Sequence, residues 1–137
     1  MRVDDVGGER WSASAHAGTA RSIASASVSV SVSGAWTIVA IAGEMDLLVV
    51  PLVSELVGAD ARHLVFELRQ VTFIDGRGLD LLLTSQRDAL KAGGCVRLVA
   101  PSRKVRRLLV LTGSNREFTT YASVDEATSV PPPTPPR

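Results

Sequence analysis

The segment Val71-Thr72-Phe73-Ile74-Asp75-Gly76-Arg77-Gly78-Leu79 constrains the fold more than any other part of this chain. Apolar, strand-forming residues are followed almost at once by a helical pattern, so a tight turn must open directly onto a helix N-terminus. The free N–H groups and the positive dipole end of such a terminus favour anions. Arg77 places a cation there instead, and this mismatch marks the turn as a candidate functional site.

The remainder of the chain alternates between strand-like and helix-like segments. Valines alternate with serines over 27–32, which predicts a half-buried strand, a hairpin turn at 34–35 and a return strand over 36–42. Further strands are expected at 63–68, 95–100 and 117–122, and helices at 47–57, 78–92, about 102–112 and 124–128. Pro51 requires its helix to begin close to it, within the first turn.

A hairpin followed by repeated helix–strand alternation predicts an α/β fold. We expect one domain over residues 25–128, with a mixed, mostly parallel β-sheet of about five strands and about four α-helices. Residues 1–24 are rich in Ser, Ala and Gly without periodicity and are expected to be disordered. The proline-rich tail, 129–137, is expected to be disordered, polyproline-like and outside the packed domain.

Charge and hydropathy narrow the range of partners and compartments. The formal net charge is +1, and the basic residues Arg103, Lys104, Arg106 and Arg107 fit the solvated face of an amphipathic helix, so no nucleic-acid partner is expected. The longest apolar run, 35–42, is too short to span a bilayer, and residues 1–24 lack the apolar core of a secretory signal. Cys95 has no cysteine to pair with. We therefore expect a cytoplasmic protein without stable membrane association.

The sequence offers no candidate for catalysis. His16 and His63 stand far apart, and no group of His, Cys or carboxylate residues has the spacing of a metal site. No nucleophile–base pair and no glycine-rich phosphate loop is present in the sequence. We therefore expect no catalytic residues, no metal and no cofactor, and a protein that is not an enzyme.

Several short motifs in fixed order resemble those of the STAS domain, named for sulfate transporters and anti-sigma factor antagonists. The resemblance covers roughly residues 26–128, and it is the order and spacing of the motifs that makes it specific. The motifs are Gly43-Glu44-Met45-Asp46-Leu47 with Pro51, Val71 to Leu79, Gly93-Gly94-x-Val96-x-Leu98, Val105-x-x-Leu108-Leu109-x-Leu111-Thr112-Gly113, and Val124-Asp125-Glu126-Ala127.

The resemblance implies an anti-sigma factor antagonist. Small single-domain members bind an anti-sigma factor that is also a serine kinase of the GHKL type, and so release a sigma factor. Phosphorylation of the second serine in the family's D-S-S-G turn adds negative charge and breaks that complex. By this resemblance the partner-binding residues are Asp46, Asp75, Gly76, Arg77, Gly78 and Leu79. The alternative is an adaptor or scaffold subunit of a stress-signalling or transport complex.

The chain departs from the family pattern at the phosphorylated position. Gly76 and Arg77 replace the two serines, so Arg77 stands where the phosphoacceptor would be and cannot take a phosphate on oxygen. Thr72, Thr84 and Ser85 are the nearby hydroxyls, and we expect structural roles for them.

The roles of the turn residues admit more than one interpretation. Asp75 can be a helix N-cap, a partner contact or both. Asp46 is expected to be the N-cap of the helix that follows it, 47–57. Arg77 either reflects drift at an exposed position or pairs with an acidic group of the partner, and a side chain of this size could equally block docking.

Overall fold

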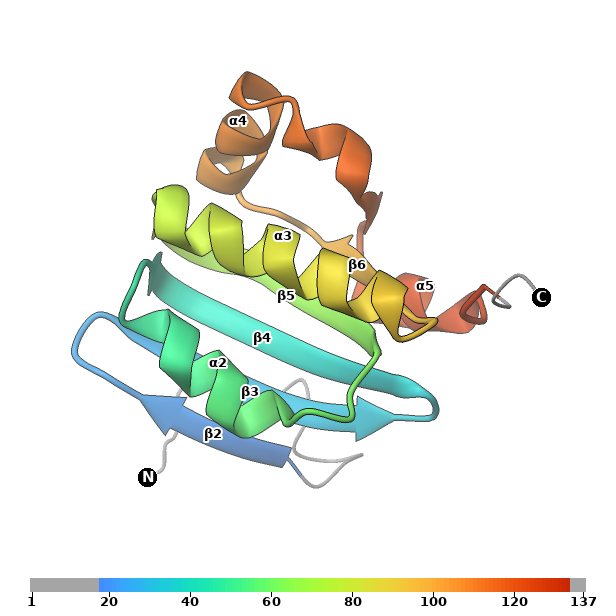
Figure 1. Ribbon diagram of the computed structural model, residues 1–137. Coiled ribbons are helices and arrows are strands. Elements are labelled where there is room, and N and C mark those ends of the chain that lie inside the picture. Colours follow the sequence, from blue (N-terminus) through green and yellow to red (C-terminus); the bar gives the residue numbers. More distant parts are fainter. Residues whose placement is uncertain (1–17, 134–137) are drawn as a thin grey trace.

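The computed structural model describes residues 18–133, and Figure 1 shows their arrangement. The strands are β2 Gly18–Ser22, β3 Ala26–Ser33, β4 Trp36–Met45, β5 His63–Ile74, β6 Cys95–Val99 and β7 Thr119–Tyr121. The helices are α2 Val49–Val57, α3 Gly76–Lys91, α4 Arg103–Leu111 and α5 Val124–Ser129, with a short 3-10 helix, η1, at Ser114–Glu117.

The strands form one six-stranded sheet in the order β2-β3-β4-β5-β6-β7. The pairs β2/β3 and β3/β4 are antiparallel, whereas β4/β5, β5/β6 and β6/β7 are parallel. Parallel neighbours need a crossover, and α2, α3 and α4 supply these crossovers. The predicted α/β fold with a mixed sheet is therefore confirmed.

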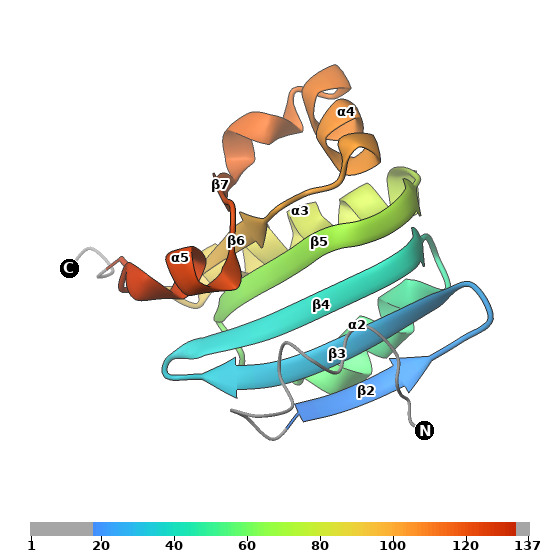
Figure 2. The same ribbon diagram turned by 180° about the vertical axis from the view of Figure 1, so that it is seen from behind.

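The main core lies between the sheet and the three crossover helices. Figure 1 shows α2 and α3 lying across one face of the sheet, and Figure 2 shows α5 on the opposite face. Alternate strand residues such as Val28, Phe66 and Leu98 point towards the crossover helices and are fully buried. Leu82 of α3 and Leu109 of α4 meet them from the helical side.

The start of α2 follows from its proline. Helix α2 begins at Val49, so Pro51 lies in the first turn, where the N–H group that it lacks would have no helical partner. This confirms the position that Pro51 predicted for the helix start.

The N-terminal boundary of the domain differs from the prediction. Residues 18–22 were placed in the disordered segment 1–24, but they form β2, which pairs with β3 from Gly18↔Ser31 to Ser22↔Ser27. All five side chains of β2 are exposed, so the strand has no hydrophobic alternation that a sequence pattern could reveal. Arg21 of β2 forms an ion pair with Glu55 of α2. The rest of the predicted disordered segment, 1–17, lies outside the described residues.

The beginning of the proline-rich tail also differs from the prediction, because Arg97 binds it to the sheet. Ser129 still belongs to α5, and the Arg97 guanidinium donates hydrogen bonds to the backbone oxygens of Ala127 (2.8 Å), Val130 (2.5 Å) and Pro131 (3.1 Å). Prolines lack a donor but keep the carbonyl acceptor, so a proline-rich segment can still be held by a guanidinium. Residues 134–137 lie outside the described range.

Arg97 is buried on the α5 face of the sheet without a carboxylate partner in the described range. Its guanidinium carbon lies 4.3 Å from the centre of the Trp36 ring and 5.4 Å from that of Tyr121. His63 meets Trp36 edge to face at 5.8 Å between ring centres. Burial, together with the charges of Arg62 and Arg97, lowers the pKa of His63 below its usual value. The three backbone oxygens and the two rings replace the water that Arg97 loses.

Replacing Arg97 with Met should release the tail. The Arg97→Met variant keeps an unbranched side chain but loses the three hydrogen bonds, and we expect it to unfold about 2 kcal/mol more easily in chemical denaturation. Amide hydrogen exchange of α5 should accelerate in the same variant. Arg62→Met, which changes an arginine outside the tail contacts, is the control. Unchanged exchange in α5 would show that Arg97 does not hold the tail.

His63 should make the fold less stable in mildly acidic solution. Its pKa is lower in the folded chain, so the unfolded chain binds more protons as the pH falls below the ordinary histidine value of 6.5. The free energy of unfolding should therefore fall from pH 7 towards the folded-state pKa of His63. Denaturation curves of the wild type and of His63→Asn at several pH values measure this, and the variant should lose that part of the pH dependence. Parallel pH profiles for the two proteins would contradict the assignment.

Candidate functional site

Two turns predicted separately as partner-binding lie side by side at the carboxyl ends of β4 and β5. Glu44 pairs with Phe73 and Met45 with Ile74 in the parallel register. The Asp75 N–H group donates a hydrogen bond to the Met45 oxygen over 3.4 Å. Residues 45–48 and 73–79, which we call the C-terminal edge, therefore form one continuous surface at the N-terminal ends of α2 and α3 (Figure 1).

Asp75 caps helix α3. Its backbone is extended, and its Oδ1 accepts hydrogen bonds from the N–H groups of Arg77 (2.9 Å) and Gly78 (3.1 Å). These are two of the N–H groups that the first helical turn leaves without a partner, and such a cap typically contributes about 1 kcal/mol. The N-cap interpretation of Asp75 is confirmed, and its carboxylate also supplies the negative charge that the helix dipole favours.

Gly78 allows α3 to begin directly on the sheet. A Cβ atom at residue 78 would lie 2.2 Å from the Met45 oxygen and 2.9 Å from Cγ1 of Ile74, distances at which atoms overlap. Gly76 differs, since a Cβ atom there would meet no atom within 4 Å. Close packing of the backbone therefore explains the glycine at residue 78, whereas the space around residue 76 would accept a side chain.

Asp46 has a different role from the predicted helix cap. The N-cap residue of α2 is Leu48, whose backbone is already helical. Oδ1 of Asp46 accepts a hydrogen bond from the Leu48 N–H group (3.0 Å), and its carbonyl oxygen accepts one from Val49 (3.1 Å). Asp46 therefore closes the turn that precedes α2, because the chain needs two further residues before it enters the helix.

The side chains of the turn divide into buried and exposed groups. Gly78 and Leu79 are buried, and Leu79 belongs to the main core, so neither presents a side chain to a partner. Gly76 and Arg77 are exposed, and Asp46 and Asp75 are partly exposed. The Arg77 guanidinium forms no hydrogen bond or ion pair with any residue in the range 18–133. Within this range Arg77 is thus an exposed cation without a partner on the first turn of α3, where such a charge costs about 0.3–1 kcal/mol.

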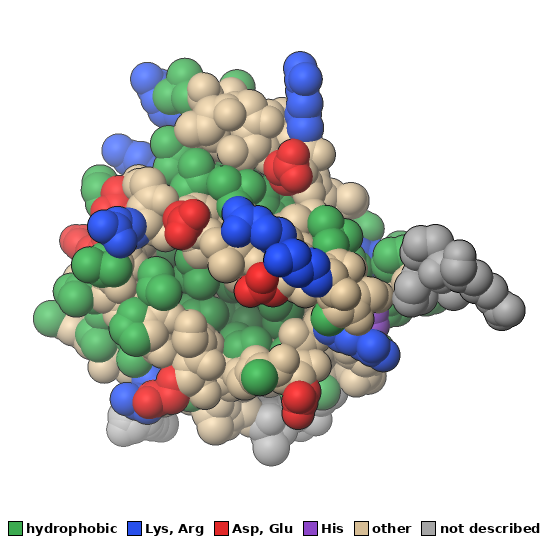
Figure 3. Space-filling view, viewed as in Figure 1, with side chains coloured by type: hydrophobic (Ala, Val, Ile, Leu, Met, Phe, Trp, Pro, Cys, Tyr) green, Lys and Arg blue, Asp and Glu red, His purple; other side chains and the backbone are tan. Residues whose placement is uncertain are grey.

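Three apolar side chains around the turn were missed by the sequence analysis. Leu47, Leu48 and Phe73 are exposed to 53%, 60% and 46%, high values for large apolar residues. Figure 3 shows apolar side chains, in green, gathered over the N-terminal end of α2. The sequence analysis placed Leu47 and Leu48 in a helix and Phe73 in a strand-like run, and it made no prediction of their exposure. No pattern in the sequence indicates that β4 and β5 end close to these three residues.

The described residues give no sign of other chemistry at this edge. Among residues 18–133, no group of three or more His, Cys, Asp or Glu side chains is arranged to hold a metal ion. Within the same range, no helix is both long and apolar enough to cross a bilayer. The C-terminal edge offers a capped turn, an exposed guanidinium and exposed apolar side chains, which are the components of a protein-binding surface.

Comparisons with known proteins agree with this geometry. The family model of the STAS domain matches residues 27–127. An anti-sigma factor antagonist from Mycobacterium paratuberculosis is similar in structure with a TM-score of 0.64 and 25% identity, over 77% of this chain and 92% of that one. The anti-sigma factor antagonist SpoIIAA of Bacillus, in its unphosphorylated form, gives a TM-score of 0.61 and 20% identity over 82% and 94% of the two chains.

The similarity extends to a transport-related protein. A sulfate transporter family protein from Wolinella succinogenes gives a TM-score of 0.61 and 19% identity, over 72% of this chain and 85% of that one. At this identity the likeness concerns the fold alone. No curated protein sequence matches this chain.

The two glycines of the turn should respond differently to the same substitution. Gly78→Ala places a methyl group against the Met45 oxygen, and we expect it to destabilise the fold by about 2–3 kcal/mol in chemical denaturation. Gly76→Ala, at the neighbouring open position, is the matched control and should stay within about 0.5 kcal/mol of the wild type. Equal effects of the two substitutions would show that close packing against Met45 does not constrain the turn.

Proposed function

Because the chain belongs to the STAS domain family, we propose that it is a regulatory binding protein of the anti-sigma factor antagonist type. Its partner is an anti-sigma factor that is also a serine kinase of the GHKL type, and binding releases a sigma factor. The proposed contact surface is the C-terminal edge. The observation that carries the proposal is the capped turn at Asp75–Leu79, which exposes Gly76 and the Arg77 guanidinium.

The composition of the edge supports protein docking. Aromatic and arginine side chains contribute most to protein interfaces, and Phe73 and Arg77 provide one of each within a single turn. Leu47 and Leu48 extend the apolar part of the surface on the neighbouring turn. The Asp75 cap and the buried Leu79 hold this surface in place, so little ordering of the backbone is needed on binding.

Arg77 has a defined part in this proposal. It occupies the position of the phosphoacceptor serine, and residues 75–79 contain no hydroxyl group. The antagonist is therefore not switched off by phosphorylation of this turn. The exposed guanidinium instead pairs with a carboxylate of the partner, a charge-assisted bond that requires no modification. The function is accordingly that of an antagonist which is always able to bind, a cytoplasmic binding protein and not an enzyme.

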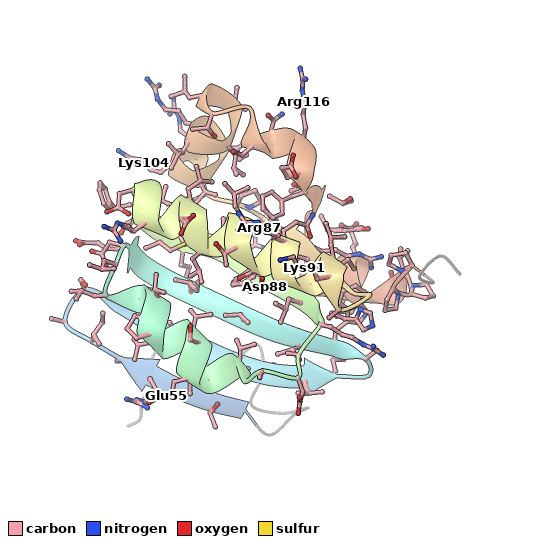
Figure 4. The ribbon with its side chains drawn as sticks, viewed as in Figure 1. Glu55, Arg87, Asp88, Lys91, Lys104 and Arg116 are labelled. Atoms are coloured by element: carbon pink, nitrogen blue, oxygen red, sulfur yellow. The ribbon has the colours of Figure 1, made fainter. Side chains whose placement is uncertain are left out.

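The first test of this function identifies the partner. The chain is used to capture proteins from its native cell, with Arg77→Ala as a surface variant and Arg87→Ala as the matched control. Arg87 projects from the second half of the same helix (Figure 4) and is equally exposed. We expect a GHKL-type kinase to be captured by the wild type and the control, and at least tenfold less by Arg77→Ala, the effect of losing about 1.4 kcal/mol. Recovery of transporter subunits instead would favour the adaptor alternative.

A second test uses the chemistry of the turn. Incubation with the captured kinase and ATP should leave the wild type without phosphate, whereas Arg77→Ser should be phosphorylated at residue 77. Phosphopeptide mapping locates any modified residue, including Thr72, which is exposed on β5. Stoichiometric phosphate on Thr72 of the wild type would contradict the unswitched antagonist. An Arg77→Ser variant that binds the kinase but takes no phosphate would contradict the position assigned to the turn.

A further inference from the structure

A second surface lies where the sheet opens between β5 and β7. Strand β6 ends at Val99, opposite Glu67, while β5 continues to Ile74. Beyond Val99 the chain leaves the sheet and enters α4, and Figure 2 shows this connection passing between β5 and β7. The Ala100 N–H group donates to the Tyr121 oxygen (2.8 Å) and the Ser102 N–H group to the Leu68 oxygen (3.3 Å). Residues 100–102 therefore form the floor of the opening.

The opening is a shallow hollow of about 560 Å³ that lies wide open to solvent. A ligand bound there would keep much of its surface in water, so its charged group has to supply most of the contacts. Three arginine side chains line the hollow, namely Arg69 from β5 and Arg103 and Arg106 from α4, opposite the Tyr121–Ala122 segment. We call this hollow the arginine pocket. It contains none of the residues 45–48 and 73–79 of the C-terminal edge.

The positive charge of the arginine pocket is only partly compensated. The Arg69 guanidinium donates to the Ala122 oxygen (3.1 Å), and its Nε lies 3.6 Å from a carboxylate oxygen of Glu67. The nearby Glu126 carboxylate accepts a hydrogen bond from the Ala122 N–H group. Arg103 and Arg106 form no ion pair with any residue of the range 18–133. Among residues 18–133, Glu67 is thus the one carboxylate within ion-pair distance of any of the three guanidinium groups, and it approaches Arg69 alone.

The start of α4 adds hydrogen-bond donors to the same place. Ser102 stands at the N-cap position, but its side chain makes no capping hydrogen bond, and the first turn contains no acidic residue. The Ser102 hydroxyl oxygen is buried and has no hydrogen-bond partner among the described residues. A buried hydroxyl without a partner is uncommon in folded proteins, and an N-terminal helical turn without a cap leaves its N–H groups free.

We propose that the arginine pocket binds the phosphate group of a phosphorylated small molecule. Guanidinium groups bind phosphate oxygens in pairs of parallel hydrogen bonds, and a doubly charged group with several oxygens can use Arg103, Arg106 and the first turn of α4 together. The volume beyond these donors, along Thr120 and Tyr121, holds the remainder of the molecule.

The test follows the backbone amides of the full chain by ¹⁵N NMR. Inorganic phosphate and glucose 6-phosphate are titrated separately at pH 7.5, with sodium chloride adjusted to keep the ionic strength constant. Both probes should shift the amides of residues 102–106 in a saturable manner. Shifts that rise linearly without saturation would overturn the proposal. If inorganic phosphate saturates the shifts and glucose 6-phosphate does not, the assignment of the pocket to a phosphorylated small molecule is overturned.

Matched arginine variants locate the bound phosphate. Arg106→Gln should raise the apparent dissociation constant for glucose 6-phosphate about tenfold, the loss of one charge-assisted contact. Arg107→Gln is the control, because Arg107 is exposed on the same helix, carries the same charge and does not line the pocket. Equal weakening by the two variants would show a non-specific charge effect and overturn the site. Kinase capture tests the C-terminal edge and phosphate titration tests the arginine pocket, so the outcome of one experiment does not decide the other.

Discussion

The close approach of Gly78 to the Met45 carbonyl is the contact on which the geometry of this molecule depends. Because residue 78 has no side chain, the first turn of α3 can rest directly on the ends of β4 and β5. Asp75 then reaches the N–H groups of residues 77 and 78, and Leu79 enters the core. The same placement leaves residues 76 and 77 facing solvent. An exposed turn of fixed shape is thus a consequence of backbone packing beneath it.

The free-energy contributions of the neighbouring residues explain why the fold tolerates a cation at residue 77. An exposed positive charge on the first helical turn is unfavourable by about 0.3–1 kcal/mol. The Asp75 cap contributes about 1 kcal/mol, and burial of a leucine side chain such as Leu79 contributes about 1.5–3 kcal/mol. The turn is therefore stable with Arg77 in it. A small local cost at an exposed residue is compatible with a surface retained for binding, which is the role proposed for the C-terminal edge.

Much of the fold could be predicted from the sequence, and the exceptions have physical causes. Alternation in 27–32, the placement of Pro51 and the Asp75 cap are local signals that retain their meaning in the folded chain. Strand β2 has five exposed side chains and is held by backbone pairing with β3 and by the Arg21–Glu55 ion pair, neither of which leaves a hydrophobic pattern. The contact of Arg97 with the tail joins residues at least 30 positions apart in the sequence. The exposure of Phe73 depends on where the neighbouring strand β4 ends, which is also remote in the sequence. The opening that forms the arginine pocket has the same origin, since β6 is shorter than β5.

The open position of residues 76 and 77 has an evolutionary consequence. Both residues are exposed, and a side chain at residue 76 would meet no neighbouring atom, so the anchoring residues on either side constrain these two positions very little. A lineage can exchange a hydroxyl for a permanent charge at residue 77, or reverse that exchange, without passing through a poorly folded ancestor. Under the proposed function, control by modification and permanent activity are then neighbouring states of one scaffold. Duplicated genes of this kind can diverge in regulation while their architecture stays the same.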